Sequence, residues 1–440
     1  MSSLPTRPLV VRVLLPILAL LLAAGTGVAP ATAKSKTPAA AEHVSFTPWD
    51  FGDEGTEAGE YQHTVDDGAL ELSAPTATRS YDDPYDGAST VATYDEGSWT
   101  SPSIGTPFGL TELVSSWNAH TPGGSWIEVT VRGVADNGVS SKPYVLGRWA
   151  DDDTAFHPTS LGGQGDDLAT VSIDTLVALN GHTFSSYKIG VTLLRPVGSS
   201  VTPRVDFVGA MASNVPDLKR HPAPPTTMTA TTELDVPTYS QELHSGDYPQ
   251  YDNGGEAWCS PTSTSMVVAS WHTGPTPEQY AYVLADHPGH QDPQVDYAAR
   301  HVFDYNYDGA GNWPFNTAYA GEFGLEGFVT RLRGLDEAEQ FIKAGIPLVA
   351  SVSFKKSELD GAGYGTNGHL MVIRGFTATG DVIVNDPASH LVPSDDQVRV
   401  VYDRQQFTDA WIGHTGGIVY VIRPDGTHLP TTLTPQERNW

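Results

Sequence analysis

The 440-residue sequence has few positive charges, little charge of any kind and almost no cysteine. Lys and Arg number 24 against 52 Asp and Glu, and the net charge of −28 excludes a basic field for nucleic acid or an anionic membrane. Charged residues make up only 17% of the chain, whereas there are 44 glycines and 33 prolines. This composition argues against coiled coils and helical repeats, and it favours turns and extended segments.

Cysteine occurs once, at Cys259. A single cysteine excludes an intrachain disulfide and a cysteine-based zinc cluster. The chain must therefore be stabilised by buried apolar surface, which its length and its 39% hydrophobic content allow in two domains. The one thiol needs an explanation of its own.

Long apolar runs are missing beyond the first 33 residues. There, Arg7 and Arg12 precede an apolar run over residues 13–24, and an Ala-Thr-Ala sequence ends at Ala33. The run is 12 residues long, against the roughly 20 needed to cross a bilayer. This pattern predicts a Sec-type secretory signal peptide cleaved after Ala33. The mature chain is then expected to be secreted and soluble, without a membrane anchor and with a net charge of −30.

Alternating apolar residues are typical of the region from 44 to 214. Ile127, Val129 and Val131 alternate with polar residues, and a second such run spans residues 187–193. Each run can bury one face of a strand, and turn clusters separate the runs. We predict an all-β sandwich or jelly roll. The roles considered for it are binding of the substrate and binding of cell-wall or extracellular glycan.

The tryptophans of this region could form a carbohydrate platform or a core. They are Trp99, Trp117, Trp126 and Trp149. A tryptophan beside a strand is more often buried than exposed, so we expect them in the core.

A proline-rich stretch at residues 221–227 marks the expected domain boundary, because it is stiff and extended. The predicted division is a signal peptide 1–33, a linker 34–43, a β-sandwich domain 44–214, a Pro-rich linker 215–233, an α+β domain 234–424 and a C-terminal tail 425–440.

Beyond the boundary, helix signals alternate with strand signals. Thr276-Pro277 predicts a helix through Ala285, and residues 335–344 predict a helix that ends at Gly345. Apolar runs predict strands at residues 347–354, 369–375, 382–385, 398–402 and 417–422. Helices first and a sheet afterwards indicate an α+β domain.

Cys259 follows a glycine-rich loop and precedes Pro261, a residue favoured in the first turn of a helix. The unpaired amides and the positive end of the helix dipole stabilise a thiolate at such a position. Met266, Ala269 and Ser270 follow at helical spacing and are expected to pack the helix inward. A small buried core residue is the alternative, but the position favours a nucleophile.

His369 is favoured among the 15 histidines as the base, because it opens an apolar strand after a flexible loop. A turn at residues 379–380 then predicts a hairpin whose second strand ends at Asn385 and Asp386. Asp386, or Asn385 as the alternative, is placed to orient His369. Together with Cys259, these residues predict a nucleophile, a base and an orienting group.

Five short stretches resemble the bacteriocin-processing (double-glycine) peptidase-like branch of the papain-like cysteine peptidases. They are residues 236–241, 256–263, 344–349, 368–375 and 384–388. The resemblance covers about residues 234–424 and implies a papain-like α+β fold. It also implies Cys259 as nucleophile, His369 as general base and Asp386 as its orienting residue. A glutamine ahead of the cysteine is implied as oxyanion donor; Gln241 matches by context, and Gln250 competes with it.

The expected function is a secreted cysteine peptidase that hydrolyses proteins or peptides through a thioester. The alternatives are a catalytically inactive domain in an extracellular glycan- or protein-binding protein, and an amide acyltransferase with the same triad. The domain is followed by no transmembrane segment or P-loop, so the transporter-fused form is not expected. We expect no nucleic-acid partner, no cofactor and no metal.

Two sequence patterns resemble parts of metal-binding motifs, but neither is complete enough to predict a metal site. Residues 304–309 match the first half of a calcium loop, but the twelfth position is Phe315 instead of glutamate. An Asx-rich turn is the simpler interpretation, and residues 309–315 are expected to form a cleft wall or a loop. His287 and His290 lie close in sequence, but no H-E-x-x-H motif accompanies them, so a metalloprotease is not expected.

Overall fold

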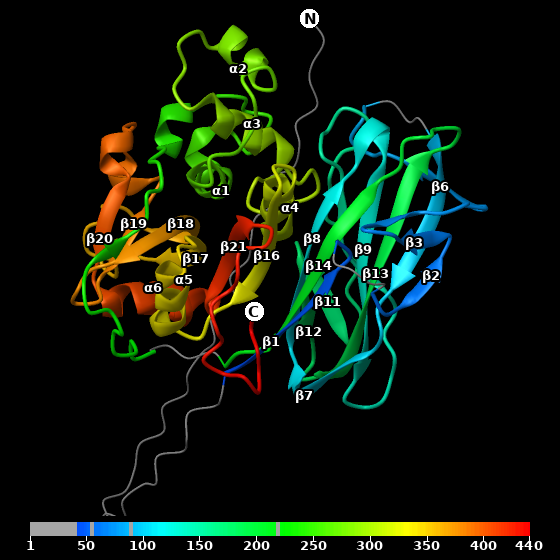
Figure 1. Cartoon of the computed structure of the whole chain (residues 1–440), viewed down its shortest axis with the longest axis horizontal. Helices are drawn as coiled ribbons and strands as arrows, with labels where there is room; N and C mark the ends of the chain where they lie inside the picture. Colours follow the sequence, from blue (N-terminus) through cyan, green and yellow to red (C-terminus); the bar gives the residue numbers. More distant parts are fainter. Residues whose placement is uncertain (1–41, 53–56, 88–90, 217–220) are drawn as a thin grey trace, which may run out of the picture. The chain divides into compact units, whose positions relative to one another are not determined.

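The computed structural model describes residues 42–52, 57–87, 91–216 and 221–440. The predicted signal peptide lies outside these ranges, as does nearly all of the linker predicted to follow it. The described residues form a part made of β-sheets and a part that mixes helices with a sheet (Figure 1). Within this described part of the chain, no helix is long and apolar enough to cross a membrane.

The part called here the β domain, residues 43–214, consists of two seven-stranded antiparallel sheets. Its strands are β1 (His43–Asp50), β2 (Glu60–Gln62), β3 (Thr64–Asp66), β4 (Leu70–Leu72), β5 (Ala77–Asp82), β6 (Val91–Thr100), β7 (Ile104–Leu110), β8 (Glu112–His120), β9 (Trp126–Ala135), β10 (Tyr144–Trp149), β11 (Ala169–Ser172), β12 (Thr175–Ala178), β13 (Phe184–Pro196) and β14 (Arg204–Asn214). One sheet has the order β11-β12-β8-β14-β4-β3, with β1 also paired to β14. The other has the order β10-β9-β13-β6-β2, with β5 paired to β6 and β7 to β13.

The period-2 pattern of the sequence explains how these sheets form a core. Ile127, Val129 and Val131 lie on β9 and are fully buried, as predicted for the inward face of a strand. On the paired strand β13, Ile189 lies opposite Val131 and Val191 opposite Val129. The strand predictions for this region are confirmed.

The tryptophans of the β domain form its core. Trp99, Trp117, Trp126 and Trp149 each have 0% exposure, so the expectation of a core role is confirmed.

The part called here the mixed domain, residues 232–424, contains a third antiparallel sheet of seven strands with the order β16-β21-β17-β18-β19-β20, and β15 pairs with β18. The strands are β15 (Thr232–Glu233), β16 (Leu325–Arg331), β17 (Leu348–Phe354), β18 (Thr366–Phe376), β19 (Val382–Asn385), β20 (Arg399–Tyr402) and β21 (Ile418–Pro424). The helices are α1 (Cys259–Ser270), α2 (Ala281–Asp286), α3 (Pro293–His301), α4 (Trp313–Gly321), α5 (Leu335–Lys343) and α6 (Arg404–Thr415). Two short 3₁₀ turns, η2 (Gln241–His244) and η3 (Gly255–Ala257), precede α1.

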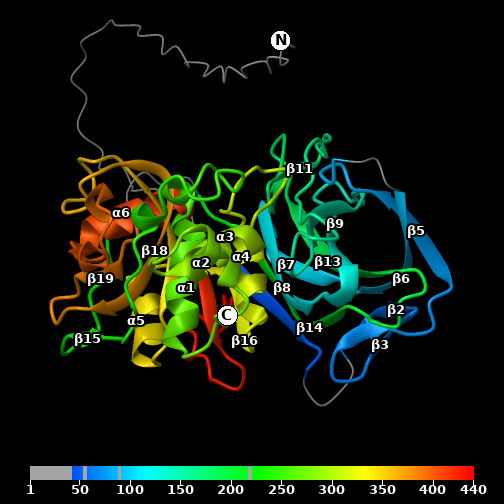
Figure 2. The same ribbon diagram turned by 90° about the horizontal axis from the view of Figure 1, so that it is seen from above.

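Helices cover both faces of this sheet. Successive residues of a strand point to opposite sides, so neighbouring residues pack against different helices. On β17, Val349 packs in the same hydrophobic cluster as Met266 of α1. Its neighbours Leu348 and Ala350 pack with Phe341 of α5 and with residues of α6. The α1 helix contacts α3 and α4, and Figure 2 shows the three helices side by side. Burial on both faces explains why the strands read as apolar runs rather than alternating ones.

Most predicted elements of the mixed domain are present. The helix predicted to end at Gly345 is α5, and Gly345 follows it with a φ of 81°, a conformation that favours glycine. The helix predicted for residues 276–285 is wrong at its start, because residues 276–280 form turns and α2 begins at Ala281. Hydrogen bonds from the Gln279 and Tyr280 N–H groups to the Thr276 carbonyl close a turn there instead.

The expected packing of α1 also needs correction. Met266 is buried as expected, but Ala269 and Ser270 are half-exposed. The helix is buried from Ser260 to Val268, because neighbouring elements surround it on several sides. A one-sided amphipathic pattern was therefore the wrong expectation for a helix that is buried nearly all round.

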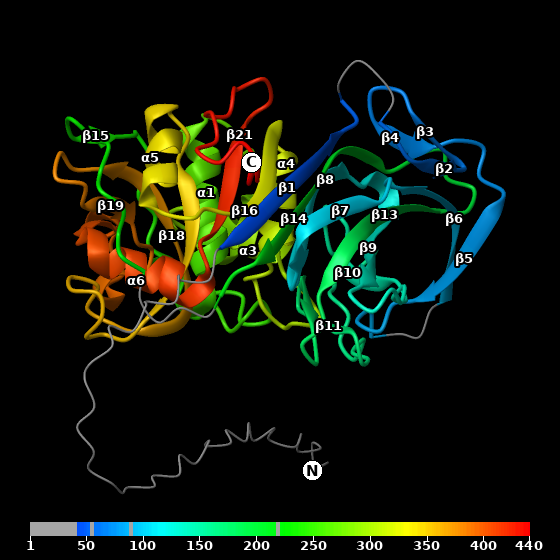
Figure 3. The ribbon, with the colours of Figure 1, turned by 90° about the horizontal axis from the view of Figure 1, so that it is seen from below.

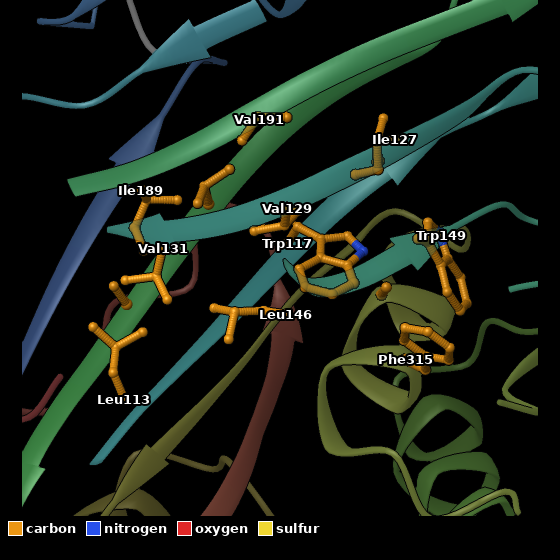
Figure 4. Packing of buried hydrophobic residues seen from close by; sticks show 14 of the residues in the cluster. Leu113, Trp117, Ile127, Val129, Val131, Leu146, Trp149, Ile189, Val191 and Phe315 are labelled. Carbon is orange, nitrogen blue, oxygen red and sulfur yellow. The ribbon is translucent and has the colours of Figure 1, made fainter. Parts of the chain in front are cut away.

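Phe315 of α4 joins the two domains through a shared hydrophobic core. Its ring centroid lies 5.1 Å from that of Trp149 and 6.1 Å from that of Trp117, both in the β domain (Figure 4). A Cβ atom at Gly147 would lie 2.7 Å from the Trp117 ring and 3.2 Å from the Phe315 ring. This contact therefore leaves no room for a side chain on β10 at that position.

Polar contacts between the two domains supplement this core. Asn118 of β8 accepts a hydrogen bond from the Gly327 N–H at 3.1 Å and donates one to the Gly327 carbonyl at 3.1 Å. Asp153 accepts hydrogen bonds from Arg300 at 2.6 Å and from Tyr305 at 2.8 Å. Figure 3 shows β1 and β14 on the side of the β domain next to β16, which contacts β14 and β8. The described residues between 42 and 440 accordingly form one compact unit.

Replacing Phe315 by alanine is expected to destabilise the whole compact unit. The substitution removes a fully buried ring that both domains contact, and Phe→Ala changes of this kind cost about 3–5 kcal/mol. Urea unfolding followed by tryptophan fluorescence measures the change. Val139→Ala, at an exposed position, should change stability by no more than about 0.5 kcal/mol. A loss below about 1 kcal/mol for Phe315→Ala would contradict the shared core.

Candidate active site

A cleft of about 760 Å³ holds the residues that the sequence singles out. Cys259, His369 and Gln241 all line it. One part of the wall comes from the β domain, namely Glu112, Val177 and residues 172–175. The cleft is thus built from both domains.

Cys259 is the first residue of α1, as predicted. The first helical hydrogen bond runs from the Thr262 N–H to the Trp258 carbonyl at 3.0 Å. The N–H groups of Cys259 and Ser260 precede it and have no partner within the helix. Cys259 itself is half-buried. A thiol and free backbone donors therefore meet at one edge of the cleft.

Side chains from α1 fix this helix to the sheet beneath it. Ser263 donates a hydrogen bond to the Leu370 carbonyl on β18 at 3.0 Å. Ser260 and Tyr420 of β21 are joined through their hydroxyl oxygens at 2.9 Å. These buried contacts fix the start of α1, and with it the thiol, relative to the strand that carries His369.

His369 lies on β18 and is 4% exposed. Its Nε2 atom lies 2.9 Å from Oδ1 of Asp386, which leaves Nδ1 as the ring nitrogen without a carboxylate partner. Burial alone would lower the pKa of His369, but the Asp386 carboxylate and the nearby Cys259 thiol outweigh it and raise the pKa to about 10. The imidazole is therefore held as a cation at neutral pH.

Asp386 is a fully buried carboxylate surrounded by donors. It accepts hydrogen bonds from the Tyr402 hydroxyl at 2.7 Å, the Tyr364 hydroxyl at 2.9 Å and the Ala388 N–H at 3.1 Å. Burial alone would raise its pKa, but His369 and these donors outweigh it and lower the pKa of Asp386. The two tyrosines escaped the sequence reasoning, because Tyr402 sits in an apolar strand and Tyr364 in a glycine-rich loop.

Asn385, the alternative partner for His369, is occupied elsewhere. Its Oδ1 accepts from Arg374 at 3.0 Å, and its Nδ2 donates to the Pro237 carbonyl at 2.8 Å. The structure therefore brings His369 together with Asp386 and not with Asn385.

The two glutamines are placed differently. Gln241 begins η2, is 2% exposed, lines the cleft and donates from Nε2 to the Glu256 carbonyl at 2.8 Å. One N–H of its amide remains available, since an amide NH₂ has two. Gln250 is exposed and is not among the cleft residues. Of the two, Gln241 is the glutamine that lines the cleft together with Cys259.

The segment that resembles a calcium loop forms a closed network of hydrogen bonds around Asp304. Its Oδ1 accepts from the N–H groups of Asn306, Tyr307 and Ser160, at 3.1, 3.1 and 2.9 Å. Its Oδ2 accepts from Asn312 at 2.9 Å. This is an Asx-turn that also links the segment to Ser160 of the β domain.

The residues after this turn serve both the cleft and the core. Tyr307, Gly311 and Trp313 line the cleft, whereas Phe315 lies in the shared hydrophobic core. The expectation of a cleft wall thus holds for the first part of the segment.

The walls of the cleft are rich in carboxylates. They are Glu112, Asp174, Glu242, Asp252 and Glu256. Burial raises the pKa of Asp174 to about 6 and that of Asp252 to about 6, and burial followed by the charge of Glu256 raises the pKa of Glu242. Arg331 also lines the cleft, but it is paired with Glu112. At neutral pH the cleft is therefore negatively charged.

A cysteine, a histidine and a buried aspartate at one cleft of a mixed α/β domain are typical of the class of cysteine peptidases. Comparison with protein-family models identifies the family. Residues 43–213 match the model of the peptidase C39 N-terminal domain, and residues 233–418 match that of the Peptidase_C39 like family. The chain belongs to the C39-like peptidases, as the five short stretches of sequence predicted.

Solved structures give weaker similarities, and no curated protein matches. The crystal structure described as that of a C39-like peptidase from Bacillus anthracis is 16% identical, with a TM-score of 0.28, and the match covers 44% of this chain and 98% of that one. A kappa-carrageenase from Pseudoalteromonas carrageenovora is 12% identical, with a TM-score of 0.20 and coverages of 41% and 100%. A Podospora anserina GH26-CBM35 β-(1,4)-mannanase is 10% identical, with a TM-score of 0.15 and coverages of 45% and 32%. These TM-scores support no further conclusion.

Asp386→Asn is expected to lower the pKa of His369 and to change how stability depends on pH. Because the folded-state pKa of His369 is raised to about 10 from 6.5, the stabilisation is complete below about pH 6.5 and is lost as the pH rises through about 10. The difference in unfolding free energy between wild type and variant should shrink over that range. Urea unfolding at each pH and an NMR titration of the His369 ring measure both effects.

The matched control for Asp386→Asn is Asp136→Asn, which alters the exposed His182–Asp136 pair. It should retain the pH dependence of the wild type. An unchanged pKa of His369 in Asp386→Asn would contradict the assigned cause.

Proposed function

We propose that this chain is an exported cysteine peptidase that hydrolyses peptide bonds through Cys259, His369 and Asp386. Cys259 is the nucleophile, His369 the general base and acid, and Asp386 the residue that orients it. Gln241 and the Cys259 N–H stabilise the oxyanion. The proposal includes the secretory signal peptide ending at Ala33.

One observation carries this proposal. His369 is buried, hydrogen-bonded through Nε2 to Asp386, and lines the same cleft as the Cys259 thiol. A histidine in that setting serves the thiol through its other ring nitrogen, Nδ1. The match of residues 233–418 to the C39-like peptidases adds independent support.

The first half of the reaction forms a thioester. The thiolate of Cys259 attacks the carbonyl carbon of the peptide bond, and the electron pair of the C=O bond moves to oxygen. The tetrahedral intermediate collapses when the C–N bond breaks, and the amine leaves with the proton that His369 carried. The Gln241 amide and the Cys259 N–H stabilise the negative oxygen, and such donors are worth about 3 kcal/mol each.

The second half releases the acyl group. Neutral His369 takes a proton from water, the hydroxide attacks the thioester carbon, and the C–S bond breaks to give a carboxylic acid and the thiolate. Asp386 stabilises the imidazolium in both halves and remains ionised. A primary amine in place of water would give acyl transfer, so product analysis is part of the test.

The proposal extends to the two domains. The mixed domain is taken as a papain-like α+β fold and the β domain as a β-sandwich, with the boundary within residues 215–233. The β domain supplies part of the cleft wall through Glu112, Val177 and residues 172–175. Its proposed role is therefore to shape the substrate site, while its tryptophans are buried and unable to serve as a carbohydrate platform.

Cys259→Ala and His369→Ala are each expected to lower kcat/KM for a casein-derived peptide by about 10³-fold or more, because each removes a group that the chemical step requires. Mass spectrometry of the products, with and without a primary amine, measures cleavage and transfer. A thiol-directed probe should label wild type and not Cys259→Ala. His182→Ala, far from these residues in the sequence and paired with Asp136, is the matched control and should retain activity. Undiminished cleavage by Cys259→Ala would sink the proposal.

The acidic walls of the cleft predict a substrate preference. Peptides with Lys or Arg next to the scissile bond should be cleaved about tenfold more efficiently than the same peptides with Glu, because the cleft carboxylates attract the cation. Glu242→Gln and Asp252→Asn should each reduce this ratio, and high salt should reduce it further. Glu60→Gln, at an exposed position on β2, should leave it unchanged. Equal rates for basic and acidic peptides at low salt would contradict the prediction.

A further inference from the structure

Four side chains that could bind a metal converge at a place separate from the cleft lining. They are His244, Asp247, His290 and Asp296, and one ligand atom of each lies within 4.8 Å of all the others. His244 ends η2, Asp247 follows it, His290 precedes α3 and Asp296 lies in the first turn of α3. The sequence drew attention to His290 but gave no sign of its partners, of which His244 and Asp247 lie in a distant segment.

The distances within this cluster are short. Nδ1 of His244 lies 2.9 Å from Nε2 of His290 and 2.9 Å from Oδ2 of Asp296. Nε2 of His290 lies 3.1 Å from the same Asp296 oxygen and 3.2 Å from Oδ2 of Asp247. Two nitrogens and two oxygens therefore point toward one small volume.

Hydrogen bonds alone do not satisfy this arrangement. Each ring nitrogen either carries one proton or accepts one, and an ionised carboxylate oxygen only accepts. With one proton on His244 Nδ1, the bare nitrogen of His290 faces two carboxylate oxygens. With the proton on His290 Nε2 instead, the bare nitrogen of His244 faces the Asp296 oxygen. With a proton on both nitrogens, two N–H groups 2.9 Å apart oppose each other. A cation between the four atoms would attract all of them at once.

Burial makes the uncompensated negative charge of this cluster unfavourable in free energy. The side chains of His244 and Asp296 are 0% exposed, and those of His290 and Asp247 are 12% and 14% exposed. Two carboxylates with two neutral imidazoles carry a charge of −2, and a buried charge needs a partner. Oδ1 of Asp296 is buried as well and has no hydrogen-bond partner among the described residues. A divalent cation would neutralise the cluster.

We propose that His244, Asp247, His290 and Asp296 form a structural Zn²⁺ site. Two imidazole nitrogens and two carboxylate oxygens suit zinc, whereas calcium and magnesium favour sites made of oxygen ligands. Zinc–ligand bonds of about 2.0–2.1 Å in a tetrahedron place the ligand atoms about 3.3 Å apart. The four distances given above are 2.9–3.2 Å, and all four ligand atoms lie within 4.8 Å of one another. The other oxygen of Asp247 lies 3.5 Å from Nδ1 of His287, which would orient the carboxylate as outer-shell partners do.

The location gives this site a positioning role, a consequence that rests on the proposed function. Zinc would tie α3 to η2, the turn that begins with Gln241. The η2 backbone is packed directly against η3, since a Cβ atom at Gly255 would lie 2.3 Å from the Gln241 carbonyl oxygen and 2.6 Å from that of His244. The chain then continues from η3 into Cys259. The metal would thus hold the oxyanion glutamine in register with the nucleophile.

The test uses the full mature chain carrying Cys259→Ala, so that the thiol neither binds zinc nor degrades the protein. Metal content after exhaustive dialysis, calorimetric titration with Zn²⁺, and the visible spectrum after Co²⁺ loading are measured. We expect one zinc per chain, a spectrum typical of tetrahedral cobalt, and a fall in Tm on chelation. None of these readouts needs activity, so failure here is distinguishable from failure of the proposed function.

His290→Ala and Asp247→Asn in that background should each weaken zinc binding by about 100-fold or more. The matched control is His157→Ala, which removes another half-buried histidine–aspartate pair, with His157 Nδ1 and Asp83 Oδ2 3.0 Å apart; it should bind zinc as the parent does. Circular dichroism verifies that the variants are folded, and Asp247→Asn keeps the shape of the side chain should His290→Ala unfold. The proposal is overturned if the parent binds no zinc, if Ca²⁺ or Mg²⁺ displaces it, or if the folded variants bind it equally well.

Discussion

The shared core around Phe315 is the contact on which the cleft depends. A helix of the mixed domain inserts this ring between two tryptophans of the β domain, and a glycine on β10 leaves the space for it. Burial of apolar surface is not directional, so the orientation is set by the polar pairs around the core, such as Asn118 with Gly327. Because the domains are fixed in this way, residues 172–175 of the β domain form a wall of the cleft.

A second constraint is the fully buried charge of Asp386. A carboxylate without water is tolerated only when donors replace its hydration, and here a histidine, two tyrosines and a backbone N–H do so. The tyrosines come from a loop and from β20, on either side of the hairpin that carries His369 and Asp386. The pKa of His369 thus depends on Asp386, and Asp386 in turn on two tyrosines, of which Tyr364 also lines the cleft.

Local patterns in the sequence predicted much of the fold. The alternation of apolar and polar residues predicted β9 and β13, apolar runs predicted β17 and β19, and Gly345 predicted the end of α5. Each of these signals depends only on neighbours in sequence. The helix at Pro277 began later than predicted, and α1 was buried more completely than its spacing implied. Contacts between distant segments could not be predicted, because no local pattern encodes them. The tyrosines beside Asp386 and the partners of His290 belong to this group.

The family could be predicted because five motifs occur in its order, although each is short. The placement of the candidate site followed less directly. Cys259 at the start of a helix and His369 on a strand could be read locally, whereas the choice between Asn385 and Asp386 required the hairpin geometry. In the sequence, the apolar residues at the contact between the domains look like those of any hydrophobic core, so no local pattern predicted a cleft built from both domains.

The turn between β11 and β12 contributes to the cleft wall. Only Ile173 and Asp174 separate these strands, and their backbone bonds are independent of α1 and β18. Under the proposed function, this hairpin tip is a part of the cleft wall that lies in a stretch of chain separate from Cys259 and His369. Evolution can therefore alter this part of the wall while the proposed catalytic residues stay intact.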